Sequence, residues 1–203
     1  MDTRYSTEQR ELRAATAALL ADLGPRTVAD LDDTARQARL AAAAASSGWF
    51  ELRGPGEGDA PLASGVEVAI VARELGRVAA DTAFLGPVVA VDLARQAGLE
   101  LADAGTSAVF EVPLCNFAVV ATSGAVDGVA VDCAGATRGL VLTAADEADD
   151  RRLVEVPLAD AAPATDLTRA LARVVLDDAT ALPGAAIAGA AVERSRALAL
   201  TIT

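Results

Sequence analysis

The side chains that could do chemistry in this chain are limited by two absences. All 17 basic residues are arginine, so the 203-residue sequence contains no lysine, and it contains no histidine either. The lack of lysine excludes a Walker-type phosphate loop, a Schiff base and a pyridoxal-phosphate site. The lack of histidine excludes Ser-His-Asp and Cys-His nucleophile pairs and an ordinary histidine zinc site. We therefore predict no metal site and no nucleophilic catalysis of these kinds.

The two cysteines, Cys115 and Cys133, are the other side chains with reactive chemistry. They could form a disulfide across neighbouring strands. Isolated cysteines are more often small buried hydrophobic residues, and nothing in the sequence indicates an oxidising compartment. We therefore favour two unpaired thiols.

A glycine-rich segment at residues 53–62 contains the sequence GPGEGDAP, which invites a phosphate-loop interpretation. The segment has no lysine, carries two acids and is not framed by a strand and a helix, as such a loop requires. We expect a surface connection instead. The aromatic pair Trp49 and Phe50, just before it, is expected to anchor a turn against the helices rather than to contact a ligand.

The composition bounds the class of protein and its partners. With 53% hydrophobic residues the chain can bury a core of one or two domains. A formal net charge of −12 argues against nucleic acid or an anionic membrane as partner, because both are negative themselves. The N-terminus is charged from its start, and no run of about 18 apolar residues looks like a membrane span. We expect a cytoplasmic protein.

Helix caps and apolar periodicity predict an all-α N-terminal domain over residues 1–104. One helix is expected over Thr7–Leu23 after a Ser6 or Thr7 cap, and another from Asp33 or Thr34 to Ser46 or Ser47. A third follows a Ser64 cap, and Gly86-Pro87 separates it from a fourth that runs to about Ala97. The third helix has one apolar stripe, formed by Val68, Val71, Leu75 and Val78.

The periodicity changes after residue 104. Short apolar runs separated by Gly, Asp and Ala clusters are typical of strands. They lie near residues 107–111, 117–122, 128–132, 140–143, 152–156 and 170–176. Strands at this spacing, with no helical pattern between them, predict a compact antiparallel barrel or sandwich. The expected fold class is therefore α+β, with a small antiparallel β-barrel as the middle domain over residues 105–181.

Residues 182–203 are expected to form a linker and a helix that packs away from the barrel. From Ala185 onward, the apolar residues of one helix face are Ile187, Ala191, Leu198 and Ile202. The sequence LALTIT is apolar and has no polar or glycine cap. This pattern indicates that the helix docks into a partner or that the chain is a fragment, and it predicts an oligomer or a second chain.

Several segments resemble one known family. Residues 64–98, SGVEVAIVARELGRVAADTAFLGPVVAVDLARQAG, resemble the N-terminal helical domain of acyl-CoA dehydrogenases, especially divergent actinobacterial ones. LAAAAASSGWFEL (40–52) is similar to the helix and glycine-aromatic turn that precede it. DLTRALARVVLDD (166–178) resembles the strand that closes the family's middle domain. Residues 185–203 resemble the start of its C-terminal helical domain, which would make this chain truncated.

The resemblance implies an FAD-dependent oxidoreductase of lipid metabolism that desaturates an acyl-CoA, either a fatty acyl or a sterol side-chain thioester. In this family a glutamate removes the α proton and flavin accepts the β hydrogen as hydride. The family's base lies beyond the end of this chain, so its catalytic residues are unknown.

The family's flavin-binding motif is degenerate in this chain. Residues 110–113 keep only the acid and the proline of the motif. Residues 117–124 keep a strand that ends in hydroxyls and glycine. Residues 127–135 resemble the family's D-G-x-x-x-x-G hairpin but lack the aromatic segment that flanks it. Thr122 and Ser123 are the candidates for flavin contact, against the alternative that they only form a turn.

The resemblance also implies partners. These are a second acyl-CoA dehydrogenase-like chain in a heterotetramer, or a second copy of this chain, and an electron-transfer flavoprotein as acceptor. In such an assembly FAD could be bound mainly by the partner chain. Two alternatives stay open: a non-catalytic structural subunit that completes a partner's site, and an unrelated acidic helical adaptor with a small barrel.

Overall fold

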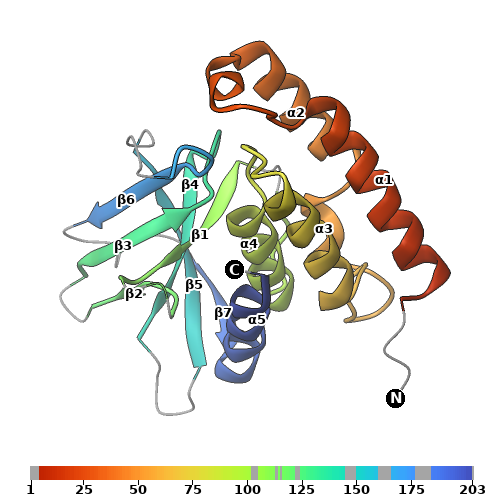
Figure 1. Ribbon diagram of the computed structural model, residues 1–203. Helices are drawn as coiled ribbons and strands as arrows, with labels where there is room; N and C mark the ends of the chain where they lie inside the picture. The colour runs from red at the N-terminus through yellow and green to blue at the C-terminus, as the bar shows by residue number, and fades with distance from the viewer. Residues whose placement is uncertain are drawn as a thin grey trace.

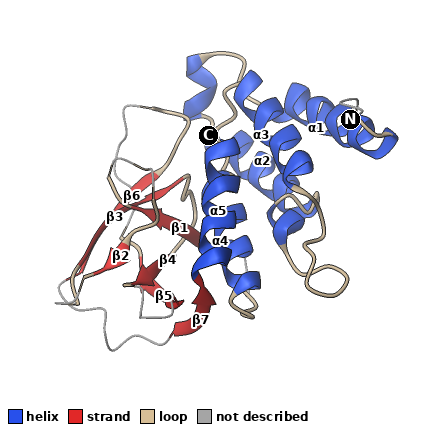
Figure 2. Ribbon diagram, turned by 90° about the horizontal axis from the view of Figure 1, so that it is seen from below, coloured by secondary structure: helices blue, strands red, loops and turns tan. Residues whose placement is uncertain are grey.

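The computed structural model describes residues 5–101, 105–112, 114, 116–121, 124–144, 150–159, 166–176 and 184–202. Four helices come first in the chain, the described strands follow, and a further helix comes after them, which confirms the expected α+β class. Figure 1 shows α4 and α5 between the strands and the outer helices α1 to α3, and Figure 2 shows the same arrangement from below. The helices are α1 (Thr7–Leu23), α2 (Thr34–Ser46), α3 (Gly65–Arg77), α4 (Leu85–Gln96) and α5 (Gly189–Ile202), with short 3-10 turns η1 (Val28–Asp32) and η2 (Phe50–Arg53) on either side of α2.

Local capping explains where the first helices begin. The Ser6 hydroxyl accepts the backbone N–H of Gln9 at 3.2 Å, and the Gln9 side chain accepts the N–H of Ser6 at 3.0 Å. The same reciprocal arrangement joins Ser64 to Glu67 at the start of α3. Each pair satisfies donors that the helix itself leaves unpaired. The bounds predicted for α1 and the Ser64 cap are confirmed.

The break between α3 and α4 lies earlier than Gly86-Pro87, at residues 78–84. The physical reason is a distant cap: Asp132 Oδ2 accepts the N–H groups of Phe84 and Leu85 at 2.7 and 2.8 Å. Gly86 then lies against the sheet. A Cβ at this position would stand 2.0 Å from the carbonyl oxygen of Val131 and 2.1 Å from Ser107 Oγ, so only glycine allows the helix to approach.

The strands form one mixed sheet in the order β6-β3-β1-β4-β5-β7, with β2 also paired to β4. β1 and β2 both run parallel to β4, while the other pairs are antiparallel. The prediction of a wholly antiparallel barrel is therefore wrong in strand direction. In the described strand order, β6 and β7 lie at opposite edges of the sheet. The cause is the short connection 132–137. It leads from β3, on one edge of β1, to β4, which pairs with the opposite edge of β1. The strands are β1 (Thr106–Phe110), β2 (Val119–Val120), β3 (Val126–Val131), β4 (Arg138–Thr143), β5 (Asp150–Pro157), β6 (Leu171–Leu176) and β7 (Gly184–Ala188).

Both faces of the sheet are buried. In β4, Leu140 and Leu142 face α4 and α5, and Val141 between them belongs to a second core on the other face. A third cluster joins α1, α2 and α3 and contains Trp49, whose ring meets Phe84 edge-on with centroids 6.4 Å apart. The predicted anchoring role of Trp49 and Phe50 is confirmed, because both are buried.

The C-terminal segment differs from its prediction in two ways. Residues 184–188 form strand β7, paired antiparallel with β5, rather than the start of a helix. The helix α5 that follows does not pack away from the sheet. Ile187 and Ala191 lie in the core cluster that joins sheet and helices, and Leu198 is buried among α1 to α3. The apolar stripe expected to need a partner is thus largely covered by this chain, and the side chain of Ile202 lies outside the described residues.

The structure describes one of the two cysteines, Cys133. Cys133 is free and buried, and this burial raises the pKa of its thiol, which makes it unreactive. Because Cys133 is free, the alternative disulfide with Cys115 is not formed, and Cys115 itself lies outside the described residues. Among the helices that the structure describes, we find none with the length and apolar character that crossing a membrane requires.

We predict that Leu75→Asp abolishes the cooperative unfolding of the helical core. Leu75 is 1% exposed, so the new carboxylate would be buried without a partner, at a cost of several kcal/mol against a total stability of about 5 to 15 kcal/mol. Thermal melting followed by circular dichroism measures the effect. Leu62→Asp is the matched control, because Leu62 is 63% exposed. A Leu75→Asp protein that melts as cooperatively as the control would contradict this core.

A second prediction concerns pH. Glu74 in α3 is buried and accepts bonds from Arg77 at 2.8 Å and from Arg13 of α1 at 3.0 Å. The Arg77 hydrogen bond, reinforced by Arg13, lowers the pKa of Glu74. A lowered folded-state pKa stabilises the fold above the unfolded value of about 4.3, and this contribution disappears as the pH falls through the folded-state pKa.

Glu74→Gln should therefore lower the free energy of unfolding at pH 7 by about 1 to 2 kcal/mol, and the difference from the wild type should shrink as the pH falls below about 4. Urea unfolding across this pH range measures it. Glu57→Gln, in the exposed loop before α3, is the control and should show no such trend. A difference that grows on acidification would refute the assignment.

Candidate functional site

The flavin-contact candidates Thr122 and Ser123 lie outside the described residues, so their role stays a prediction. On either side of them, Gly124 N–H donates to Ala121 O at 2.8 Å and Ala121 N–H donates to Ala125 O at the same distance. Glu111, the acid of the degenerate motif, is partly buried just after β1 and accepts a hydrogen bond from Asn116.

The space between the sheet and the helices is filled by side chains. Phe110 and Phe117 stack with ring centroids 5.1 Å apart, and both belong to the core cluster shared by β1, α4 and α5. A flat ring system such as a flavin needs an open slot between layers. The described part of this junction offers a packed core instead.

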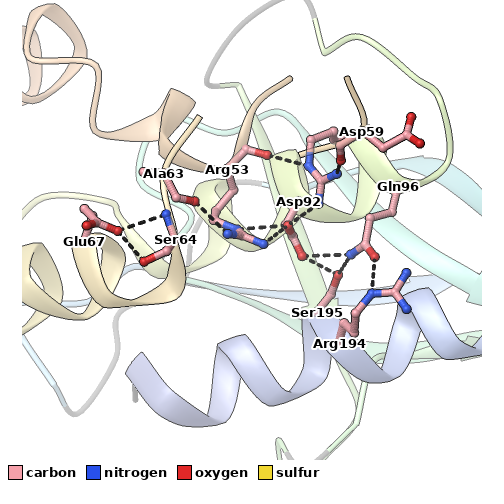
Figure 3. A network of polar contacts seen from close by, with 10 residues as sticks. Arg53, Asp59, Ala63, Ser64, Glu67, Asp92, Gln96, Arg194 and Ser195 are labelled. Carbon is pink, nitrogen blue, oxygen red and sulfur yellow. Dashed lines mark hydrogen bonds and ion pairs between the residues drawn. The ribbon is translucent and has the colours of Figure 1, made fainter. Parts of the chain in front are cut away.

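The most extensive polar network surrounds Asp92, a carboxylate that α4 buries at 1% exposure (Figure 3). Its Oδ1 accepts from Arg53 at 2.9 Å and from Arg95 at 3.1 Å. Its Oδ2 accepts from the Ser195 hydroxyl at 2.6 Å and from the Gln96 amide at 2.9 Å. These donors come from η2, α4 and α5, so one carboxylate joins three segments that are far apart in sequence.

The network also fixes the glycine-rich loop. Arg53 donates to the Ala63 carbonyl at 2.8 Å, and Arg95 donates to the Asp59 carbonyl at 2.8 Å (Figure 3). No phosphate-loop geometry is needed to explain this segment. The surface connection expected from its sequence is confirmed, with Arg53 turned inward to Asp92 as the one feature that the sequence did not predict.

Other buried carboxylates are paired in the same way. Asp81 binds Arg36 through both oxygens, Glu74 binds Arg13 and Arg77, and Asp132 binds Arg169. Each of these carboxylates is directed toward arginine donors. Among the described residues, these buried acids therefore hold the structure together rather than serve as a general base. No group of three acids or cysteines within that part of the chain has the arrangement of metal ligands.

A partly open pocket of about 180 Å³ lies where α3, the start of α4 and the end of β3 meet. Asp132 and Arg169 line it together with apolar side chains, which are Ala72, Leu75, Phe84, Leu85 and Val131. Sequence reasoning missed this pocket, because its walls come from segments that are up to about 100 residues apart. An acid directly after a strand, Asp132, was the only local signal.

Comparison with known proteins gives a result at the level of structure only. No protein-family model and no curated protein sequence matches this chain. Its fold, helices followed by a mixed sheet and a further helix, is that of acyl-CoA dehydrogenases, which confirms the resemblance in the sequence. Identities of 15–19% show the fold alone.

Three solved structures illustrate the likeness. A variant of the steroid acyl-CoA dehydrogenase Tcur3481-Tcur3483 matches 96% of this chain with a TM-score of 0.65 and 19% identity. The ChsE4-ChsE5 complex from Mycobacterium tuberculosis matches 100% with a TM-score of 0.57 and 15% identity. An acyl-CoA dehydrogenase complexed with FAD from Bacillus anthracis matches 91% with a TM-score of 0.54 and 15% identity. This chain spans 61%, 61% and 38% of those chains, respectively.

We predict that Asp92→Asn destabilises the protein by about 3 kcal/mol, because it leaves two half-buried arginines, Arg53 and Arg95, without their counter-charge. Urea unfolding measures the loss. Asp59→Asn is a matched control: Asp59 is exposed and contributes only its backbone carbonyl to Arg95 (Figure 3). Equal stabilities of the two variants would show that the Asp92 network is not essential.

Proposed function

We propose that this chain is a subunit of a flavin-dependent acyl-CoA dehydrogenase that forms an α,β-double bond in an acyl-CoA thioester. The observation that carries the proposal is the match of 96% of the chain to a steroid acyl-CoA dehydrogenase at a TM-score of 0.65. A fatty acyl or a sterol side-chain thioester is the proposed substrate class. We also propose the domain division 1–104, 105–181 and 182–203, in which the last segment adds β7 to the sheet before its helix.

The proposed cofactor is FAD, which accepts hydride in this class of reaction. The described residues of this chain do not fit an FAD by themselves. The junction of sheet and helices is filled by Phe110 and Phe117, and the pocket at Asp132 holds about 180 Å³, below the 300–1,000 Å³ typical of sites for much smaller ligands. We therefore propose that a partner chain supplies most of the flavin contacts, and we assign no catalytic step to residues of this chain.

The proposed partner is a second acyl-CoA dehydrogenase-like chain, or a second copy of this one, with a heterotetramer as the expected assembly. Two of the similar structures support this, since their names pair two gene products. Because the apolar stripe of α5 is largely buried within this chain, the contact must use other surfaces. An electron-transfer flavoprotein is the proposed electron acceptor.

A second candidate function is a non-catalytic structural subunit that completes the site of a partner dehydrogenase chain. The pairing of the described buried acids favours it, because a subunit that performed the proton abstraction would need one free carboxylate. Both candidates require a partner. They differ in whether this chain binds any flavin alone.

Flavin absorbance at about 450 nm distinguishes these functions. We expect the purified chain to be colourless, and the complex co-expressed with the dehydrogenase-like chain from its genomic neighbourhood to carry flavin. Light scattering on the same samples measures the assembly. A yellow chain on its own would favour the catalytic subunit over the structural one. A stable monomer that neither binds flavin nor associates with the neighbour would refute both and favour the unrelated adaptor.

A further inference from the structure

We propose that the pocket at Asp132 and Arg169 binds a small monocarboxylate carried on a single apolar ring or short branched chain. The proposal rests on the shape of the pocket and on the state of its two charged side chains. It does not depend on the proposed dehydrogenase function.

The size of the pocket sets the size of the ligand. Its apolar wall is formed by Ala72 and Leu75 of α3 together with Phe84 and Leu85 at the start of α4, and its volume is about 180 Å³. An apolar cavity of about 150 Å³ in another protein accepts benzene. This pocket therefore has room for one ring and its substituent, and not for a nucleotide or a flavin.

The hydrogen bonds of Asp132 hold it between the start of α4 and Arg169. Its Oδ2 accepts the N–H groups of Phe84 and Leu85, and both of its oxygens accept from Arg169 Nη1 at 3.0 Å. The carboxylate is 2% exposed and is held in place from two sides. It acts as a fixed support for the guanidinium.

Arg169 retains donors for a ligand. Only its Nη1 bonds to Asp132, and within the described part of the chain neither its Nε nor its Nη2 has a hydrogen-bond partner. The side chain is 30% exposed and lines the pocket. A guanidinium offers these remaining N–H groups in the planar arrangement that matches the two oxygens of a carboxylate.

The local charge favours an anion. Asp132 and Arg169 cancel one another, and the N-terminus of α4 adds a partial positive charge beside them. The nearby acid Asp166 makes its hydrogen bonds to Thr168, whose N–H and hydroxyl donate to it at 2.9 and 2.7 Å, and its carboxylate interacts with Arg169 only through its charge. A carboxylate is therefore preferred over its neutral isostere.

The pocket shares Val131 and Asp132 with the hairpin 127–135, but it lies apart from Glu111, the acid of the degenerate flavin motif. Ser107, near the start of β1, bonds to the Val131 carbonyl at 2.9 Å beside the pocket, whereas Glu111 follows the other end of the same strand.

Benzoate tests the proposal, with benzamide as the neutral isostere. Binding to the full chain is measured by calorimetry and by NMR shift changes. We expect saturable benzoate binding, at least about tenfold tighter than benzamide, which corresponds to about 1.4 kcal/mol. Absence of saturable benzoate binding, or equal affinity for the two compounds, would overturn the proposal.

Two pairs of variants locate the binding. Ala72→Leu fills the pocket without changing its charge and should weaken benzoate binding at least about tenfold, while Ala69→Leu, on α3 but outside the pocket, should not. Arg169→Gln should remove the preference for benzoate over benzamide, while Arg173→Gln, which alters an exposed ion pair, should keep it. Because Arg169→Gln also weakens the support of α4, thermal melting of each variant accompanies the titrations. Unchanged binding by a folded Ala72→Leu protein would place the ligand elsewhere and refute the site.

Discussion

The burial of α4 on almost every side is the constraint on which the rest of the structure depends. The sheet covers one face through Val89 and Leu93, α3 and its neighbours cover another through Val88, and α5 packs alongside. A helix in this position cannot hydrate its polar groups, so each must find a partner inside the protein. Asp132 supplies acceptors for its first N–H groups, and two arginines, a serine and a glutamine satisfy Asp92.

The helix caps show how much of this fold the sequence predicts. Ser6 and Ser64 cap their own helices within three residues, so local spacing was sufficient to place α1 and the start of α3. Asp132 caps α4 from 48 residues away, and no local pattern distinguishes it from any acid that follows a strand. The pocket beside it was missed for the same reason. Apolar periodicity predicts which face of a helix or strand is buried. A cap supplied by a distant residue depends instead on which elements pack together in the fold.

The sheet shows the same limit in strand order and direction. Alternation located most strands, but it carries no information on whether neighbours run parallel, and the route of the chain past β1 decided that here. Residues 184–188 show a different limit. The sequence GAAIA has high helix propensity, yet it forms β7 because the open edge of β5 offers a full set of backbone partners. Tertiary hydrogen bonding outweighs propensities of less than about 1 kcal/mol per residue.

The exclusive use of arginine as the basic residue connects stability with function. Its fixed fork of donors holds a buried carboxylate in one geometry, which Asp92, Asp81 and Asp132 exploit. Each acid employed in this way is directed toward its arginine partner and holds two elements together. The described interior therefore uses its carboxylates to join α4 and α5 to the sheet and the outer helices. Such a rigid scaffold agrees with the proposed structural subunit, in which groups outside this set of acids would react with the substrate.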